Sequence, residues 1–276
     1  MKYLKELYYK NIYPNFFKPT IKQTKYKIFK NIKKKIRPQD VIIITAYDKN
    51  YAKIGKISEK SIKKYSAKFG FKFKIFTIPK NFNRHKAWYK IKLINDLLKI
   101  NKYKIIFWID SDAIFTRYED LRNVIDNYHE FYLVSHNVKV DNKTKFNNTK
   151  LAISRLNTGV MIFKNSNFNQ KLIKDIWSKK KYINSGWWDN SALLDVLGYK
   201  GEIEKNLNKH KGKLKYVKKM KLIPLEWNSV PSSNNLEFSL ETFNPIILHT
   251  AGFNFIHKRD LMKKYIEQKN KIKFKL

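Results

Sequence analysis

The sequence predicts an α/β fold of three layers, with a mostly parallel central sheet covered by helices on both faces. Two observations predict this fold class. Short continuous apolar runs suit strands that are buried on both faces. Between residues 41 and 110 these runs alternate with segments whose apolar residues repeat at helical spacing. Such a succession favours parallel strands joined by crossover helices.

Three strands and two helices account for residues 41–110. The strands are expected at residues 41–44, 71–78 and 103–110. The first helix places Ile62, Tyr65 and Phe69 on one face. Gly70 follows it, where a C-terminal cap belongs. The second helix has its apolar face on Trp88, Ile91, Ile94 and Leu98.

The second half continues the alternation. A strand at 130–135 precedes a polar loop, which His136 and Asn137 open and which runs to about residue 150. A turn and strand at 156–165, a helix around Phe168, Leu172 and Ile176, and a short helix within 186–198 follow. Late strands are expected in "KLIPLEW" and in "PIILHTAG", the second ending at His249. No repeat or linker interrupts this series, so we predict a basic leader at 1–40, one domain at 41–256 and a basic tail at 257–276.

The chain is strongly basic, with 59 Lys and Arg against 22 Asp and Glu and a formal net charge of +37. A basic surface can bind nucleic acid or an anionic membrane by releasing counterions. Here the charge is spread along the whole length and accompanies the residues that A/T-rich codons encode. We therefore attribute most of it to base composition and expect no specific nucleic-acid partner.

The sequence shows no membrane-spanning segment, because no stretch reaches the roughly 18 uninterrupted apolar residues that a span requires. Residues 1–40 mix aromatic residues with lysine and lack the apolar core of a signal peptide. We expect a soluble or peripheral protein of undetermined compartment. The leader could contact an anionic membrane surface.

Two carboxylates, Asp110 and Asp112, interrupt the apolar run "IIFWIDSDAIF" with only Ser111 between them. Residues two apart in a strand point to the same side, here at a strand end where open α/β sheets bind ligands. Two like charges so close demand a cation, and the chain has no cysteine to supply thiolates. Oxygen ligands suit Mg²⁺ or Mn²⁺ completed by phosphate oxygens. The alternative is structural: Asp110 caps a turn and Asp112 is solvated.

His249 repeats this placement at a second strand end, in "IILHTAG". Its imidazole directly follows an apolar run, and Gly252 would permit close approach of the backbone to a ligand. A hydrogen-bonded core histidine is the alternative. The remaining histidines lie in polar or amphipathic contexts and carry no comparable signal.

Asp189 stands in the first turn of an expected helix, where the helix dipole favours an anion. Its neighbours Trp187 and Trp188 could equally form the wall of a sugar subsite. Both interpretations remain open from the residues alone.

The segment "NTG", residues 157–159, is a turn first and a hydrogen-bonding ledge for sugar hydroxyls second. Lys90 and Trp88 fit an ordinary amphipathic helix. None of these residues is diagnostic by itself.

Taken in order, "TAYD", "AWYKIKLI", "WIDSDAIF", "LNTGVMIFKN", "WWDNSALL" and "LHTAG" resemble the signature series of a glycosyltransferase with the GT-A fold, a Rossmann-like three-layer α/β fold. The series resembles glycosyltransferase family 34 in particular, the galactosyl/mannosyltransferases of the fungal Golgi and the plant xyloglucan xylosyltransferases. The resemblance covers roughly residues 41–252, and the ordered set is specific although each piece is weak. It implies retaining transfer from a nucleotide sugar, with Mn²⁺ held by an Asp-x-Asp motif and a late histidine.

The resemblance implies a role for each matching residue. Asp110, Asp112 and His249 would hold Mn²⁺ or Mg²⁺. Asp189 and Asn190 would line the reacting sugar, with Asp189 beneath its anomeric carbon. The donor-binding set would be Thr45, Ala46, Tyr47, Lys90, Ser111, Asn157, Thr158, Gly159 and Gly252.

We therefore expect a retaining, metal-dependent hexosyl- or pentosyltransferase with a nucleotide-sugar donor and a glycan or glycoprotein acceptor. Family members are anchored by an N-terminal membrane helix that this sequence lacks, so we expect electrostatic membrane contact or a soluble form instead. No feature selects galactose, xylose, mannose or glucose. Two alternatives are a basic nucleic-acid-binding protein and a catalytically inactive GT-A scaffold. Slow hydrolysis of one sugar donor discriminates among the three.

Overall fold

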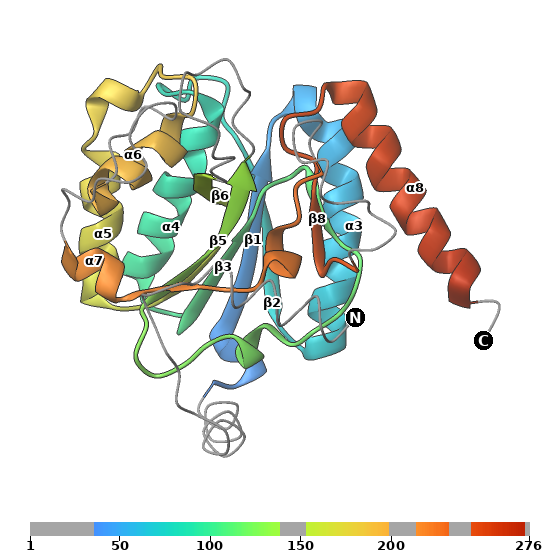
Figure 1. The fold of residues 1–276 in the computed structure, drawn as a ribbon, viewed down its shortest axis with the longest axis horizontal. Helices are drawn as coiled ribbons and strands as arrows, with labels where there is room; N and C mark the ends of the chain where they lie inside the picture. Colours follow the sequence, from blue (N-terminus) through green and yellow to red (C-terminus); the bar gives the residue numbers. More distant parts are fainter. Residues whose placement is uncertain (1–35, 139–152, 199–213, 232–243, 274–276) are drawn as a thin grey trace, which may run out of the picture.

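The computed structural model describes residues 36–138, 153–198, 214–231 and 244–273. Residues 1–35 of the expected leader and residues 139–150 of the expected loop lie outside this part of the chain. The centre of the fold is a six-stranded sheet with the order β2-β1-β3-β6-β5-β7 (Figure 1). Its strands are β1 Val41–Tyr47, β2 Lys72–Thr77, β3 Ile105–Ile109, β5 Phe131–Val138, β6 Ile153–Lys164 and β7 Met220–Leu222.

The sheet is mostly parallel, as predicted. β1 is parallel to both β2 and β3, and β5 is parallel to β7. β6 runs antiparallel to both β3 and β5, which the sequence did not indicate. Every residue of β3 is buried, because helices cover both faces of the sheet.

Helices form the two outer layers (Figure 1). One face carries α4 Tyr89–Ile100, α5 Asn167–Trp177, α6 Trp188–Leu197 and α7 Leu214–Lys218. The other carries α3 Ala52–Phe69, and α8 Phe255–Lys273 packs against α3. The predicted helix stops are confirmed: Gly70 and Gly198 have φ of 71° and 96°, a left-handed conformation that glycine adopts without a steric cost.

The boundary that we drew between domain and tail at residue 256 falls inside α8. Met262 of this helix is buried in one cluster with Ile54 of α3. Residues on both sides of the boundary therefore belong to one helix that packs against α3.

A second, two-stranded antiparallel sheet joins β4 Ala113–Phe115 to β8 Ile247–His249. Three residues are too few to show an alternating pattern, so β4 was not predicted. β8 was predicted as a strand ending at His249, and this is confirmed.

Three local predictions are wrong. "NTG" lies within β6, opposite a register shift in β5, and is not a turn. β5 continues to Val138 because its backbone pairs with β6 beyond residue 135, so His136 is a buried strand residue. In "KLIPLEW" only the start is a strand, and Leu225–Asn228 form the 3-10 helix η6.

No helix within the described ranges combines the length and the apolar character needed to cross a bilayer.

Candidate active site

Asp110, Asp112 and His249 meet where the two sheets join. After β3 a turn, closed by an Ala113 N–H to Asp110 carbonyl bond of 3.0 Å, leads into β4. Ala113 pairs with His249 across the small sheet, and the Thr250 N–H donates to the Asp112 carbonyl at 3.0 Å. This register brings the imidazole beside the acidic pair. His249 Nε2 lies 3.3 Å from Asp112 Oδ1 and 3.8 Å from Asp110 Oδ2.

Two neighbours fix the His249 ring. Its Nδ1 lies 2.9 Å from Asn228 Oδ1, which leaves Nε2 facing the carboxylates. Asn228 in turn donates to Asn157 Oδ1 at 3.0 Å. A Cβ added to Gly159 would lie 2.1 Å from His249 Cε1, so only glycine at this point of β6 lets the ring pack here.

The ligand set fits a divalent cation. One ligand atom from each of Asp110, Asp112 and His249 lies within 4.8 Å of the others. Two carboxylates and an imidazole suit Mn²⁺ or Mg²⁺ when further positions are left for phosphate oxygens or water. Burial acts to raise the pKa of Asp112, but its contacts with His249 and Lys258 outweigh burial and hold the pKa below the usual range. The carboxyl of Asp112 is therefore ionised at neutral pH, the form that a cation ligand requires.

Lys90, in the first turn of α4, links this cluster to Asp189. Its Nζ lies 2.8 Å from Asp110 Oδ1 and 3.5 Å from Asp189 Oδ2, and donates to the Thr158 carbonyl at 3.3 Å. Burial alone would lower the pKa of Lys90, but the two carboxylates raise it, so the side chain stays cationic. Asp110 Oδ1 also accepts from Trp108 Nε1 at 2.7 Å.

Asp189 and Asn190 lie in the first turn of α6, and this predicted placement is confirmed. Asp189 is only 2% exposed, and burial raises the pKa of its carboxyl to about 6 despite the nearby Lys90. Asn190 Oδ1 accepts from the Thr158 N–H at 3.1 Å, which ties α6 to β6.

Trp188 precedes Asp189 with a φ of 41°, a left-handed conformation that is strained for a bulky residue. Its indole stacks on the His85 ring with centroids 3.6 Å apart and planes 3° from parallel. The start of α6 is thus held in one conformation next to the buried carboxylate.

Thr45, Ala46 and Tyr47 form the carboxyl end of β1. Thr45 Oγ1 is buried without a hydrogen-bond partner among the described residues. The Tyr47 ring packs on Gly55, where a Cβ would lie 2.3 Å from it, and its hydroxyl donates to Glu59 at 2.7 Å. The ring is therefore held against α3.

The structure joins part of the predicted set by direct contacts. The joined residues are Lys90, Asp110, Asp112, Asn157, Thr158, Gly159, Asp189, Asn190 and His249. Ser111 is buried in the turn after β3, and Gly252 has a φ of 83° just beyond β8. The three β1 residues, Ser111 and Gly252 have no described side-chain bond to this group.

Sequence reasoning missed three partners that approach the predicted ligands from distant parts of the chain. The Tyr51 hydroxyl lies 3.3 Å and Lys258 Nζ 2.5 Å from Asp112 Oδ2, and Asn228 orients His249. None carries a local signal. Lys258, for example, is one of 59 Lys and Arg residues.

The sequence matches the family described as nucleotide-diphospho-sugar transferase over residues 40–264. No curated protein matches it. Among solved structures, a glycosyltransferase involved in glycosylation of the major capsid of PBCV-1 is similar at TM-score 0.57 and 11% identity, covering 81% of this chain and 98% of that one. GlyE of Streptococcus pneumoniae TIGR4 is similar at TM-score 0.48 and 16% identity, covering 83% of this chain and 60% of that one. The galactosyltransferase LgtC, solved with donor and acceptor sugar analogues, is similar at TM-score 0.47 and 12% identity, covering 83% of this chain and 95% of that one.

The similarity to the PBCV-1 enzyme, at 11% identity, is one of fold. The family match spans residues 40–264 and so includes every described strand and the whole of the cluster. It is consistent with the resemblance to family 34 in the sequence. The chain therefore belongs to the nucleotide-diphospho-sugar transferase family and is a glycosyltransferase with the GT-A fold.

Proposed function

We propose that the protein is a retaining, divalent-metal-dependent glycosyltransferase that moves a hexose or pentose from a nucleotide sugar to a hydroxyl of a glycan or glycoprotein. The observation that carries the proposal is the convergence of Asp110, Asp112 and His249 within 4.8 Å, next to a buried lysine that contacts Asp189. A cation held by the first three residues would bind the diphosphate of the donor, and Asp189 would contact its sugar.

Asp110, Asp112 and His249 would hold Mn²⁺ or Mg²⁺. A cation bound there would stabilise the negative charge that develops on the departing nucleoside diphosphate. Lys90 orients Asp110 through their 2.8 Å contact. Lys258 places a further positive charge beside Asp112, and this charge would attract an anionic diphosphate to the cation site.

Asp189 is the group that we assign to the reacting sugar. Lys90 contacts both Asp189 and Asp110, so this carboxylate borders the metal ligands. When ionised, it would stabilise positive charge at the anomeric carbon or attack that carbon. Asn190 holds the turn that carries it through the Thr158 N–H.

The test is hydrolysis of a panel of nucleotide sugars, with released nucleoside diphosphate as the readout, in a titration with Mn²⁺. We expect the wild type to turn over one donor slowly, and Asp112→Asn to lose more than about 100-fold of that rate. Asp96→Asn, which changes an exposed partner of Lys92, is the matched control and should behave as the wild type.

Three outcomes would contradict the proposal. Equal, metal-independent activity in the wild type and Asp112→Asn would remove the metal from the reaction. Salt-dependent nucleic-acid binding without donor hydrolysis would favour a nucleic-acid-binding protein. Donor binding without turnover would favour an inactive scaffold.

A further inference from the structure

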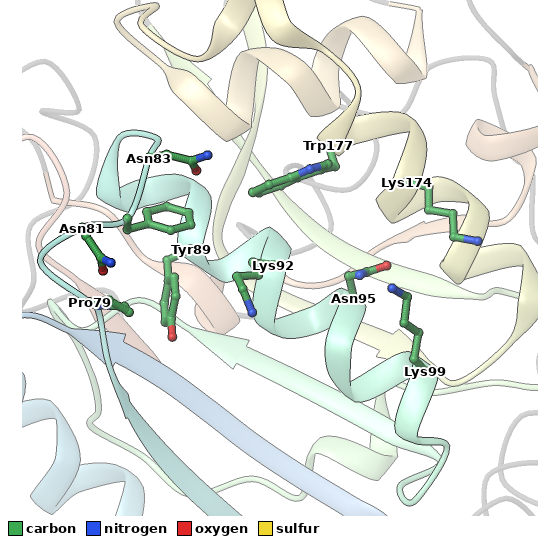
Figure 2. A pocket seen from close by; sticks show the side chains of 10 residues that line it. Pro79, Asn81, Asn83, Tyr89, Lys92, Asn95, Lys99, Lys174 and Trp177 are labelled. Carbon is green, nitrogen blue, oxygen red and sulfur yellow. The ribbon is translucent and has the colours of Figure 1, made fainter.

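A groove of about 670 Å³ takes no part in the cluster described above. It lies against α4 and α5 and is bordered by the segment that follows β2 (Figure 2). Its volume is in the range of ligand sites. Aromatic rings, side-chain amides and lysines line it, and no acidic side chain is among the lining residues.

Aromatic rings form the middle of the groove, where Figure 2 shows Tyr89 and Trp177 between the two ends. Phe82 packs edge-on against Tyr89 with centroids 5.1 Å apart. Arg84, which does not line the groove, lies over Trp177 at 3.6 Å from the ring centroid and donates to its carbonyl at 2.8 Å. The indole is thereby fixed, and fixed aromatic planes are surfaces on which the C–H faces of sugar rings pack.

Lys92 lies between the two ends, where it pairs with Asp96, and the other polar side chains lie at the ends. Asn81 and Asn83 lie at one end, and Asn95, Lys99 and Lys174 lie at the other (Figure 2). Within the described ranges, none of the three asparagine side chains has a hydrogen-bond partner, and neither lysine has an ion pair. These groups are therefore available to a ligand.

The groove adjoins the catalytic cluster through the first turn of α4. Tyr89 lines the groove, and Lys90, the next residue, contacts Asp110 at 2.8 Å. From Tyr89 to Lys99 the groove follows roughly 15 Å of helix, enough for several sugar rings. A chain bound here would have one end near the metal ligands.

We propose that this groove binds the acceptor, and that the acceptor is an anionic oligosaccharide carrying carboxylate, sulfate or phosphate groups. The inference rests on the proposed function, since only a glycosyl transfer requires such an acceptor. Aromatic planes receive sugar rings, free amides receive hydroxyls, and the unpaired Lys99 and Lys174 receive acidic groups. Single-stranded nucleic acid also binds aromatic rings and cations, but its phosphates need positive charge along the whole groove. Here the unpaired lysines lie at one end only.

The test measures binding of a hyaluronan hexasaccharide, which has a carboxylate on alternate sugars, to the full chain by calorimetry. About 0.15 M salt screens non-specific surface attraction. We expect tighter binding than that of neutral chitohexaose, and at least about tenfold weaker binding by Lys99→Glu/Lys174→Glu. The control, Lys60→Glu/Lys64→Glu, makes the same charge change on exposed positions of α3, across the sheet, and should stay within about twofold of the wild type.

Location is tested separately by tryptophan fluorescence. Trp177→Phe keeps an aromatic plane, so it should retain binding but lose most of the quenching that the hexasaccharide causes. The inference would be overturned if the Lys99/Lys174 and Lys60/Lys64 variants lost equal affinity for the hexasaccharide. Full quenching in Trp177→Phe, or the absence of saccharide binding, would also overturn it. RNA hexamer binding that depends on Lys99 and Lys174, in place of saccharide binding, would also overturn it.

Donor hydrolysis with Mn²⁺ is measured on the same variants and should be unchanged. If the wild type hydrolyses the donor but the groove substitutions leave saccharide binding unchanged, this inference fails and the proposed function stands. Absence of hydrolysis in the wild type would defeat the proposed function instead.

Discussion

The ammonium group of Lys90 lies 3.5 Å from the carboxylate of Asp189. The same ammonium contacts Asp110 at 2.8 Å, so this one buried lysine pairs with two carboxylates from different parts of the chain. Taking these charges out of water is costly, and their mutual contacts offset the cost only while all partners are present. A charged group of this kind marks a functional centre more than a source of stability.

Replacing Lys90 by methionine should therefore destabilise the fold. Lys90→Met keeps the side-chain volume but leaves Asp189 buried without its cation, and we expect a loss of about 3 kcal/mol or more in the free energy of unfolding. Lys92→Met, two residues along the same helix, breaks only the exposed pair with Asp96 and should cost less than about 1 kcal/mol. Urea unfolding measures both. A loss for Lys90→Met no larger than that for Lys92→Met would contradict the prediction.

Asp189 should make the stability of the protein depend on pH. Burial raises its pKa from 3.8 to about 6, so the folded chain binds this proton more tightly than the unfolded chain. The resulting stabilisation is complete below the lower value and is lost as pH rises through the higher one. Asp189→Asn does not ionise, so its free energy of unfolding minus that of the wild type should grow by roughly 2.5 kcal/mol between about pH 4 and pH 7.

Urea unfolding of both proteins across that range measures this difference, in which other titrating groups largely cancel. A flat difference for Asp189→Asn would show that burial does not shift this carboxyl.

A methyl group at Gly159 should displace His249, one of the three candidate metal ligands. The added Cβ would lie 2.1 Å from His249 Cε1 and 2.5 Å from Nδ1, so the imidazole must move. We expect Gly159→Ala to weaken Mn²⁺ binding by about 10- to 100-fold and to cost about 1–3 kcal/mol of stability. Gly186→Ala, where a Cβ meets nothing within 4 Å, is the control. Calorimetric titration with Mn²⁺ measures the affinity of both variants. Unchanged affinity in Gly159→Ala would show that the His249 ring can shift without weakening Mn²⁺ binding.

Lys258 and a divalent cation should compete for Asp112. Lys258 Nζ lies 2.5 Å from Asp112 Oδ2, so its ammonium and a bound cation would both be attracted to the same carboxylate and would repel each other. Without donor present, Lys258→Met should bind Mn²⁺ about tenfold more tightly, because a nearby positive charge is removed. Lys264→Met, at an exposed position of the same helix, should change the affinity little. Equal effects of the two variants would mean that only net charge matters.

The predicted elements that the structure confirms depend on local pattern. The apolar runs at β1 and β3, the amphipathic faces of α3, α4 and α5, and the glycine stops at Gly70 and Gly198 all follow from side chains within a few residues of each other. Two of the wrong predictions and the one missed strand involve pairing between distant segments. "NTG" and His136 are strand residues because β5 and β6 pair with each other, and β4 exists because β8 lies beside it.

The candidate ligands divide in the same way. Asp110 and Asp112 could be proposed from the sequence because a spacing of two in a strand and a nearby apolar run are readable there. Tyr51, Asn228 and Lys258 could not, since they approach the cluster from chain positions far from the residues they contact. The hydrogen bond from Lys258 to Asp112 joins residues 146 apart in the sequence.

The sequence by itself therefore determined the order and type of most elements and the chemical character of the site, because backbone periodicity and residue chemistry act over short stretches of chain. The tertiary structure alone decided that β6 runs antiparallel, that His249 faces Asp112 across a small second sheet, and that Lys90 bridges Asp110 and Asp189. These relationships arise when packing brings distant segments together, and no local pattern records which segments will meet.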